Sequence, residues 1–549
     1  MKSKVRPVPK GRAVDPKALD EVRALLGDAP RQRDLLIEYL HKINDRFGQL
    51  RAAHLAALAQ EMRLALTEVY EVATFYHHFE VVKEGEAAPP ALTVRVCDSI
   101  ACELAGAQDL LKMDLGKDVR VIPAPCVGRC ELAPCVVVGQ NPVANATLDS
   151  VTRAVEARQV SAAVDRYIGY AEYRKHGGYK LIRDCLDGKR KREDLTKIME
   201  DSGLRGLGGA GFPAGRKWRL VAAEPEPRVM AVNIDEGEPG TFKDRWYLER
   251  DPHRFLEGML VAAWCAGVGE IWIYLRDEYA GCRAILEKEL QLLKGAAPCA
   301  LPPIHLRRGA GAYICGEESA MIESIEGKRG MPRLRPPYVA QVGLFGRPTL
   351  EHNMETVHWV REIVEKGAQW FAAQGRNGRK GLRSFSVSGR VKKPGVHLAP
   401  AGITLNELVK EYCGGMLEGH ELYAYLPGGA SGGILPASKA DIPLDFDTLQ
   451  PHGCFIGSAA VVVLSNQDKA SSAAVNLMKF FHDESCGKCT PCRVGTGKAV
   501  TLMQEAKWNQ PLLAELSQAM MDASICGLGQ AAPNPALSVM KYFPHEIQG

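Results

Sequence analysis

The sequence predicts a multidomain α/β protein with helical regions at both ends. Three observations predict it. A chain of 549 residues is long enough for three or four domains. Short apolar strands alternate with helices in two segments, 89–160 and 165–380, as they do in βαβ units. Apolar residues recur at helical spacing before the first segment and again after residue 466.

The N-terminal part divides into a helical region and a small α/β domain. Residues 1–88 are expected to be helical, because apolar side chains recur at helical spacing, as they do between Leu36 and Ile43. EGEAAPP (Glu84–Pro90) predicts a linker. Residues 89–160 predict a strand at ALTVRVC, a helix over Leu104–Met113, and further strands at DVRVIP and CVVVG.

The rest of the chain predicts three further units. Residues 165–380 hold the apolar strands RVMAVNI and EIWIYL between helices, which predicts a larger α/β domain. Residues 383–465 contain short strands and turns with one helix, Leu405–Tyr412, and predict a small β-rich domain. Residues 466–549 are expected to be mostly helical.

Composition is that of an ordinary globular protein and excludes several classes of function. The net charge is only +4, so we expect no nucleic-acid partner. The basic N-terminus has no apolar core behind it and is not a secretory signal. The densest apolar stretch, Ala459–Leu464, is too short to span a bilayer, so no membrane span and a cytoplasmic protein are expected.

Three cysteines stand at intervals of three residues in ESCGKCTPCRVG: Cys486, Cys489 and Cys492. A C-x2-C-x2-C loop is typical of three corners of a [4Fe–4S] cubane. The fourth ligand must come from elsewhere, and Cys526 in SICGLGQ is the only cysteine that follows. Zinc and purely structural cysteines are the alternatives, although zinc sites usually use two separated CxxC pairs.

A second set of cysteines lies in the small α/β segment. Cys97 and Cys102 form C-x4-C, and Cys126 and Cys130 form C-x3-C, each pair on a loop after a predicted strand. Four thiolates from two loops suit a [2Fe–2S] rhomb, whereas spacing alone leaves zinc open. The other eight of the sixteen cysteines are scattered and are expected to be buried small apolar residues.

Three loops predict a nucleotide site. Ser202–Trp218 is rich in glycine, and backbone N–H groups unshielded by Cβ can surround a phosphate, although a flexible loop is the plain alternative. Asn233–Arg245 follows the strand RVMAVNI and carries four acids where α/β folds place ligands. Such carboxylates accept from ribose hydroxyls and repel a 2′-phosphate, which favours NAD over NADP. Gly309–Ala320 is a third glycine-containing loop and ends in two glutamates.

Together these motifs resemble one family. GLRGLGGAGFPAGRKW, NIDEGEPGTFKDR, GAGAYICGEES and ESCGKCTPCRVG with SICGLG are similar to the flavin-bearing, NADH-oxidising subunit of respiratory complex I, from about residue 165 to the C-terminus. Upstream, VYEVATFYHHF (Val69–Phe79) and the C-x4-C…C-x3-C pattern resemble the thioredoxin-like [2Fe–2S] subunit of that complex. The chain therefore resembles a fusion of the two.

The resemblance implies a fold and a set of cofactors. After the helical region 1–88, it implies a thioredoxin-like [2Fe–2S] domain over 89–160 and a Rossmann-like FMN- and NADH-binding domain over 165–380. A β-grasp domain over 383–465 and a helical bundle with an iron–sulfur cluster over 466–549 complete the chain. The implied cofactors are FMN, NAD(H), one [4Fe–4S] and one [2Fe–2S].

The resemblance also implies individual site residues. Those expected to hold FMN are Gly206, Gly208, Gly209, Ala210, Gly211, Lys217, Asn233, Asp235, Glu236, Asn353 and Thr356. Those expected around NADH and the flavin are Phe212 and Tyr338 beside the adenine, Glu238 at the ribose, and Tyr313, Gly316, Glu317 and Glu318 from the third loop. Three positions depart from the family pattern: Leu207 replaces Arg, His352 replaces Asn, and Leu220 replaces an aromatic on the adenine side.

The implied reaction is hydride transfer from NADH to FMN, followed by single-electron transfer to the clusters, with no side chain acting as nucleophile. Similar fused chains are the diaphorase β subunits of NAD-dependent formate dehydrogenases, whose α subunit carries further iron–sulfur clusters and a molybdenum or tungsten pterin. Related chains occur in NAD-reducing hydrogenases and in complex I-like NADH dehydrogenases. All four N-terminal cysteines are retained and no further ferredoxin-like cysteine run is present, which favours formate dehydrogenase. The alternative of a different class is a zinc-holding, non-catalytic scaffold.

Overall fold

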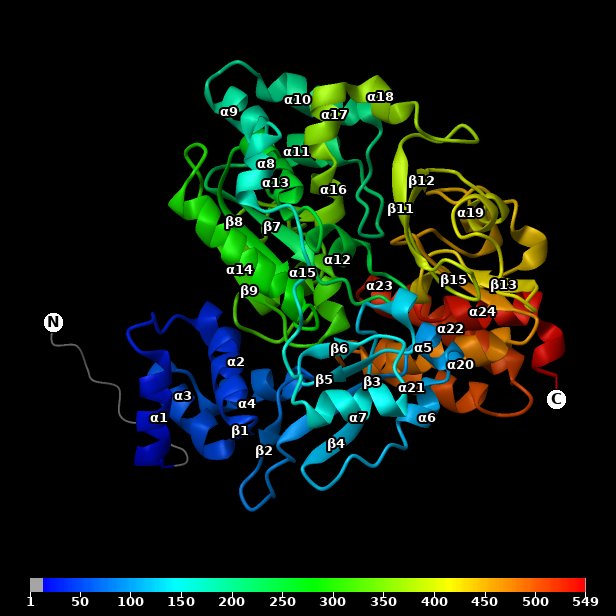
Figure 1. Cartoon of the computed structure of the whole chain (residues 1–549), viewed down its shortest axis with the longest axis horizontal. Coiled ribbons are helices and arrows are strands. Elements are labelled where there is room, and N and C mark those ends of the chain that lie inside the picture. Colours follow the sequence, from blue (N-terminus) through cyan, green and yellow to red (C-terminus); the bar gives the residue numbers. More distant parts are fainter. Residues whose placement is uncertain (1–12, 549) are drawn as a thin grey trace.

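The computed structural model describes residues 13–548 and folds them into four β-sheets with helices around and between them (Figure 1). The first twelve residues of the region predicted over 1–88 lie outside the described part. The N-terminal helices (blue) lie at one end of the molecule, and the C-terminal helices (orange to red) lie beneath the sheet drawn in yellow. None of the helices within residues 13–548 has the length and apolar character needed to cross a bilayer.

The N-terminal region is helical, as predicted, and its described part from residue 13 onward contains four α-helices. Their inward faces carry apolar residues that are fully buried, such as Val22, Leu40, Leu58 and Val72. A short parallel pair, β1 and β2, forms the first sheet. The elements are α1 (Pro16–Leu26), α2 (Leu36–Phe47), β1 (Leu50–Arg51), α3 (Ala52–Met62), α4 (Leu66–Phe75) and β2 (Val81–Val82).

The second sheet has the order β4-β3-β5-β6, with β3 parallel to β4 and antiparallel to β5. Its strands are β3 (Leu92–Cys97), β4 (Val119–Ala124), β5 (Val136–Val138) and β6 (Asn141–Val143), and α7 (Leu148–Glu156) follows them. The single helix predicted over Leu104–Met113 is wrong. The chain instead forms α5 (Ile100–Leu104) and α6 (Ala107–Leu110), because Gly106 between them has a left-handed φ of +86° that ends the first helix.

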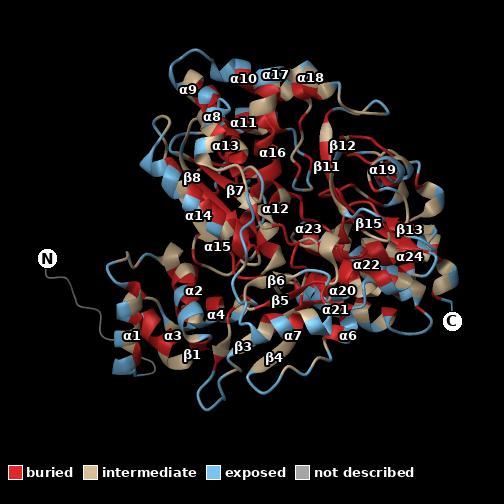
Figure 2. Cartoon of the chain, viewed as in Figure 1, coloured by how far each residue is buried: buried red, intermediate tan, exposed pale blue. Residues whose placement is uncertain are grey.

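The third sheet is parallel and has the order β10-β7-β8-β9. The predicted strands RVMAVNI and EIWIYL are its central pair. Residues 229–232 of β7 are fully buried, as expected of a parallel strand covered on both faces (Figure 2). The strands are β7 (Arg228–Ile234), β8 (Val268–Leu275), β9 (Ile304–Arg308) and β10 (Thr349–Asn353).

This strand order creates a switch point. The chain runs from β7 to β8 to β9 on one side and then returns to place β10 on the other side of β7. Loops leaving the carboxyl ends of β7 and β10 therefore diverge, and such crevices are where open α/β sheets bind ligands. The helices of this region are α8 (Tyr170–Lys175), α9 (Lys180–Leu186), α10 (Arg192–Ser202), α11 (Ala214–Ala222), α12 (Lys243–Leu248), α13 (Pro252–Ala266), α14 (Ala280–Gly295), α15 (Glu318–Ile325), α16 (Met354–His358), α17 (Val360–Lys366) and α18 (Ala368–Ala372).

The last two units are a mixed five-stranded sheet and a helical region. The sheet has the order β12-β11-β15-β13-β14, and its helix α19 (Leu405–Glu411) begins at a capping box made by Thr404 and Glu407. Its strands are β11 (Leu382–Gly389), β12 (Gly395–Pro400), β13 (Leu422–Leu426), β14 (Leu435–Pro436) and β15 (Ala460–Ser465). The C-terminal helices are α20 (Ala470–Asp483), α21 (Thr490–Met503), α22 (Gln510–Ala523), α23 (Gly527–Ala531) and α24 (Asn534–Tyr542).

Candidate functional site

A cavity of about 290 Å³, here called the central cavity, lies at the switch point of the parallel sheet. Its walls come from the glycine-rich loop, the acidic loop after β7, the third loop, β10, the five-stranded sheet and α23. Eleven of the predicted cofactor residues line it: Gly208, Gly209, Ala210, Asn233, Asp235, Glu236, Glu238, Tyr313, Gly316, Glu317 and Asn353.

The glycine-rich loop can approach the cavity closely only because it lacks side chains. A Cβ added at Gly208 would lie 2.9 Å from the Cβ of Asn353, and Gly209 has a φ of +122°. Gly206 closes the loop by donating its N–H to the carbonyl of Phe212 at 2.8 Å. The Leu207 N–H donates to the hydroxyl of Thr356 at 2.9 Å. A loop fixed in this way presents backbone rather than side chains to a ligand.

Two paired asparagines hold the loops on either side of the switch point. Asn233 is the penultimate residue of β7 and donates from its amide to the carbonyl of Gly316 at 2.9 Å. Asn353 ends β10, caps α16 by accepting from the Glu355 N–H at 3.1 Å, and donates to Asp244 at 2.6 Å. Each amide therefore ties the end of a strand to a loop that lines the cavity.

Buried charges surround the acidic loop. The Glu236 carboxylate accepts from the backbone N–H of Asp244 at 2.8 Å and from the hydroxyl of Tyr279 at 2.8 Å. Burial raises its pKa to about 7, and the nearby Asp244 adds to this. The Lys243 ammonium lies between Asp244 at 2.8 Å and Glu355 at 3.1 Å. Burial lowers the pKa of Lys243, but these carboxylates outweigh it and the net direction is upward.

Glu238 connects the acidic loop to the five-stranded sheet. It accepts from the Tyr313 hydroxyl at 2.7 Å and from the backbone N–H of Ser431 at 2.8 Å. Glu317 caps α15 by accepting from the N–H groups of Ser319 and Ala320 at 3.0 and 2.9 Å. The structure thus places both predicted glutamates on the cavity wall with fixed orientations.

Seven predicted residues do not line the central cavity: Gly206, Gly211, Phe212, Lys217, Glu318, Tyr338 and Thr356. Lys217 donates to the carbonyl of Glu351 at 3.0 Å, and Glu318 pairs with Arg335 at 2.7 Å. Phe212 and Tyr338 are 36% and 56% exposed. Gly206, Phe212 and Thr356 fix the glycine-rich loop through the bonds given above, and the roles implied for all seven stay predictions.

Twelve lining residues were not predicted, namely Gly237, Thr241, Lys243, Asp244, Ile314, Ser431, Phe455, Gly457, Ser458, Gly527, Leu528 and Ala531. Lys243 and Asp244 belong to the motif NIDEGEPGTFKDR, so the same acidic loop could have indicated them. Those from the five-stranded sheet and α23 lie far along the chain from the glycine-rich loop. Only the tertiary structure brings them to it.

The donor set of the central cavity fits a flavin nucleotide. Asp235 Oδ2 is buried without a hydrogen-bond partner in the structure, so an acceptor is available for a ligand hydroxyl. Burial raises the pKa of this carboxyl well above its usual range. The glycine-rich loop offers backbone N–H groups for a phosphate, and the carboxylates of Glu236 and Glu238 offer further acceptors.

The four N-terminal cysteines come together at the ends of β3 and β4. Cys97 ends β3, Cys102 lies in α5, and Cys126 and Cys130 follow β4, all of them at most 3% exposed. The sulfurs of Cys126 and Cys130 are 3.3 Å apart. Hydrogen bonds from the Cys130 and Cys97 thiols hold the pKa of Cys126 well below its usual range. The Cys97 thiol interacts with the sulfurs of Cys102 and Cys126, so the four cysteines lie together, and their role as [2Fe–2S] ligands stays a prediction.

The C-terminal cysteines flank the beginnings of α21 and α23. Cys486 and Cys489 precede α21, Cys492 lies in its first turn, and Cys526 caps α23. A Cβ added at Gly529 would lie 2.9 Å from the Cβ of Cys492, so the turn that follows Cys526 packs directly on Cys492. In residues 13–548, no three His, Cys, Asp or Glu side chains are arranged to hold a single metal ion.

Both cysteine sets adjoin the central cavity. Gly527 and Leu528, which follow Cys526, line it. On the other side, one guanidinium bridges the cavity and the N-terminal set: Arg276 donates to the carbonyl of Glu236 and, at 2.7 Å, to the carbonyl of Cys126. Arg245 donates to the carbonyl of Gly128 at 2.8 Å. Each set is therefore connected to the wall of the cavity.

Family models match four successive segments of the chain. They are the thioredoxin-like [2Fe–2S] ferredoxin over 22–159, the Nuo51 FMN-binding domain over 199–362, the SLBB domain over 384–435, and the NADH-ubiquinone oxidoreductase-F iron–sulfur binding region over 472–549. These matches confirm the predicted cofactor domains and the predicted resemblance.

Known proteins resemble the chain over most of their length. The NADH-quinone oxidoreductase F subunit 2 of Rhizobium meliloti (strain 1021) is 40% identical over 390 residues, which cover 68% of this chain and 92% of the relative. The NADH-quinone oxidoreductase F subunit of Aquifex aeolicus (strain VF5) is 38% identical over 389 residues, 68% and 89% of the two chains. A chain of an NAD⁺-reducing [NiFe]-hydrogenase in the H2-reduced state aligns with a TM-score of 0.83 at 30% identity, over 94% of both chains.

The matched domains contain the glycine-rich loop, the acidic loop and both cysteine sets. The chain therefore belongs to the family of NADH-quinone oxidoreductase F subunits, joined here to a thioredoxin-like [2Fe–2S] domain, and is an NADH-dependent flavin and iron–sulfur oxidoreductase subunit.

Proposed function

We propose that this chain is the diaphorase β subunit of an NAD-dependent formate dehydrogenase. Its partner would be a catalytic α subunit with further iron–sulfur clusters and a molybdenum or tungsten pterin. The observation that carries the proposal is the complete N-terminal cysteine set, Cys97, Cys102, Cys126 and Cys130, which is buried and linked to the central cavity through Arg276. The other eight cysteines are scattered along the chain, seven of them buried, and offer no third cluster motif.

FMN, when bound, accepts a hydride from NADH and releases the electrons one at a time to iron–sulfur clusters. The chain's own residues bind and orient the two nucleotides. The glycine-rich loop would hold the flavin phosphate with backbone N–H groups, and Asp235 with its unpartnered oxygen would accept from a flavin hydroxyl. Glu238, fixed by Tyr313 and Ser431, would accept from the NADH ribose and repel a 2′-phosphate.

The two cysteine sets would hold the iron–sulfur clusters to which electrons pass from the flavin. Cys486, Cys489, Cys492 and Cys526 would hold the [4Fe–4S], and the N-terminal set would hold the [2Fe–2S]. Arg276 fixes the Cys126 loop against Glu236 and would keep the [2Fe–2S] beside the flavin.

A hydrogenase diaphorase is the second candidate function, and one observation favours it. The NAD⁺-reducing [NiFe]-hydrogenase chains match 94% and 95% of this chain, so they share its whole domain order. The relatives among the NADH-quinone oxidoreductases cover 68% of this chain and support the NADH-oxidising half.

Purification of the native complex tests the choice of partner. The complex would be assayed for NAD⁺ reduction with formate and, separately, with hydrogen, and its α subunit would be analysed for molybdenum, tungsten and nickel. Formate-dependent reduction with molybdenum or tungsten supports the proposal. Hydrogen-dependent NAD⁺ reduction by a complex whose α subunit contains nickel would overturn the formate dehydrogenase proposal in favour of a hydrogenase.

The isolated chain tests the diaphorase module against the scaffold alternative. An anaerobically prepared chain would be expected to contain FMN, iron and acid-labile sulfide, and to reduce ferricyanide with NADH. A colourless protein with zinc and no flavin would instead support the non-catalytic scaffold.

A further inference from the structure

A second cavity, of about 250 Å³, lies behind the glycine-rich loop, between the parallel sheet region and the five-stranded sheet. It is separate from the central cavity, and the two share no lining residue. One wall is the start of the glycine-rich loop, and the other is the chain that leads into β11. Its lining residues include Gly203, Leu204, Arg205, Leu207, Arg379, Lys380, Arg383, Asp445 and Phe446.

Positive charge dominates this cavity. Arg205, Arg379, Lys380 and Arg383 line it, and Asp445 is the only carboxylate among its lining residues. Arg379 and Arg383 share that carboxylate, at 2.8 and 2.5 Å. Two guanidiniums on one carboxylate leave a net positive charge in a partly dry space, where it is costly without a counter-ion.

Two cations at this cavity are incompletely partnered: Arg383 lacks one hydrogen-bond partner, and Lys380 lacks an ion-pair partner within the described residues. The Arg383 residue is only 4% exposed, and its Nε has no hydrogen-bond partner in the structure. Burial lowers the pKa of this guanidinium, so Asp445 does not fully compensate its charge. Lys380 is exposed at the mouth and, within residues 13–548, forms no ion pair.

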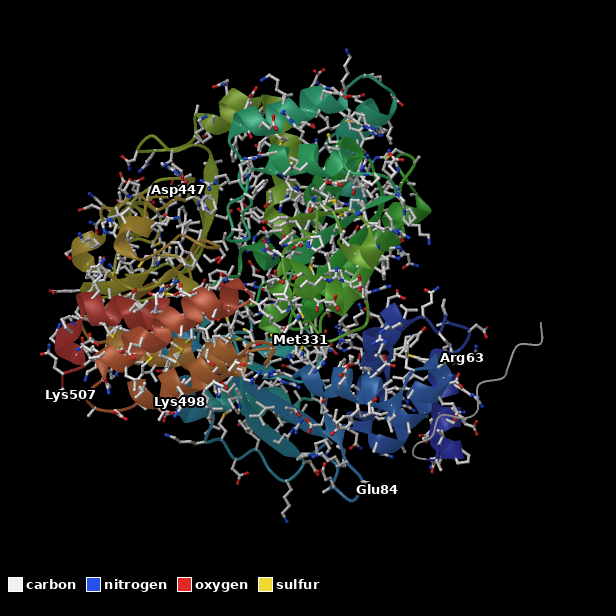
Figure 3. The ribbon with its side chains drawn as sticks, turned by 180° about the vertical axis from the view of Figure 1, so that it is seen from behind. Arg63, Glu84, Met331, Asp447, Lys498 and Lys507 are labelled. Carbon is white, nitrogen blue, oxygen red and sulfur yellow. The ribbon has the colours of Figure 1, made fainter. Side chains whose placement is uncertain are left out.

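Neighbouring carboxylates outside the lining supply only part of the missing negative charge. Asp447 (labelled in Figure 3) lies 2.6 Å from Arg205 and 3.9 Å from Arg379, so it offsets one of the four lining cations. Glu355, which acts on Arg383 from further away, is already paired with Lys243 at 3.1 Å. An excess of cationic groups therefore faces the second cavity.

We propose that this second cavity binds a small anion that carries a phosphate group. Guanidinium groups bind phosphate oxygens with pairs of parallel hydrogen bonds, and a lysine at the mouth adds a point charge. Leu204, Leu207 and Leu382 supply an apolar wall, which suits an organic phosphate ester better than a fully hydrated ion.

The site is placed to act on the nucleotide site through one loop. Gly203 packs on Lys380, since an added Cβ would lie 3.0 Å from its Cδ. Gly211 packs on Phe446, since an added Cβ would lie 2.6 Å from its Cδ1. The Cζ atoms of Arg205 and Arg383 lie 4.5 and 4.3 Å from the centre of the Phe446 ring. An anion bound to those guanidiniums would therefore adjoin side chains that pack on both ends of the loop whose Gly208–Ala210 segment lines the central cavity.

Calorimetric titration of the FMN-loaded chain tests the proposal. Saturating NAD⁺ would be present throughout, so that the flavin and the dinucleotide occupy the nucleotide site and the probes report on another one. Inorganic phosphate and ribose 5-phosphate would be titrated separately at matched ionic strength. We expect saturable binding that Lys380→Gln weakens about tenfold, because one charge-assisted contact is lost. The matched control is Lys410→Gln, which removes an equally exposed lysine from α19 on the same sheet.

The probes also identify the source of the phosphate. Tighter binding of ribose 5-phosphate supports an organic ester as the ligand, and equal binding supports free phosphate. Binding that is not saturable, or that Lys380→Gln and Lys410→Gln affect alike, overturns the proposal. The measurement depends on neither the partner subunit nor turnover, so its failure is distinct from failure of the proposed function.

Discussion

Asn233 and Asn353 lie opposite each other at the carboxyl ends of β7 and β10, in register across the parallel pair. Their side chains point to different loops. Asn233 donates to Gly316 of the third loop, and Asn353 donates to Asp244 of the acidic loop. Because the strand order reverses between these two strands, the pair fixes both sides of the crevice in which the cofactor cavity forms.

The first prediction concerns Asn353→Ala. The change removes the cap of α16, worth about 1 kcal/mol, and leaves the buried carboxylate of Asp244 with Lys243 but without its amide donor. We expect the dissociation constant for FMN to rise at least about tenfold. Flavin titration of the apoprotein measures it. Asn406→Ala is the control, because Asn406 makes a comparable amide-to-carboxylate bond to Asp441 at an exposed site. Equal flavin affinity in the two variants would contradict the role given to Asn353.

Gly208→Ala tests the close approach of the glycine-rich loop. The added methyl group would lie 2.9 Å from the Cβ of Asn353, so the loop must move away from the cavity. We expect FMN retention after gel filtration to fall severalfold while the fold is kept, as judged by circular dichroism. Gly269→Ala is the matched control, since its Cβ would meet nothing within 4 Å. A Gly208→Ala protein that retains full flavin would show that the loop backbone does not contact the cofactor.

Cysteine variants test which sulfurs hold which cluster. Cys126→Ser is expected to abolish the [2Fe–2S] signal in electron paramagnetic resonance spectra of the reduced protein and to leave the [4Fe–4S] signal. Cys526→Ser is expected to do the reverse, because the Cys526 turn packs on Cys492 rather than on the N-terminal set. Cys299→Ser is the control, as Cys299 lies outside both sets. Loss of both signals in either cluster variant would contradict two independent sites.

The sequence predicted the parts of the site that follow single strands and short motifs. The strand RVMAVNI became β7, and the acidic loop after it lines the cavity, because a buried parallel strand has a strong local signature. The cysteine sets were predictable because their ligands stand at fixed short spacings. The prediction of one helix over 104–113 was wrong because Gly106 adopts a left-handed φ, which helical periodicity does not indicate.

What the sequence could not predict is contact between distant segments. Ser431 donates to Glu238 across 193 residues of chain, and Leu528 lines the same cavity from α23. Neither residue belongs to a motif that binds nucleotides, so only the packing of the five-stranded sheet and the C-terminal helices reveals them. The same holds for Arg276, a single arginine that joins the cavity to the Cys126 loop.

The last prediction concerns pH and His41, which joins the N-terminal helices to the parallel sheet region. His41 Nε2 lies 2.8 Å from the carbonyl of Gly309, and burial lowers the histidine pKa from 6.5 to about 4. Between these two values the unfolded chain takes up a proton that the folded chain does not, so stability falls as pH drops through this window. We expect His41 to account for a loss of about 2 kcal/mol between pH 7 and pH 5.

His41→Gln isolates this contribution, because a glutamine amide can still donate to the Gly309 carbonyl but does not titrate. We expect the midpoint of urea unfolding, followed by circular dichroism, to shift less between pH 7 and pH 5 in this variant than in the parent chain. His176→Gln, at the exposed end of α8, should keep the parental shift. The reason is that an exposed imidazole stays solvated in both states, whereas His41 must lose its hydration to pack against β9 and its following loop. An unchanged shift in His41→Gln would place the pH dependence elsewhere in the molecule.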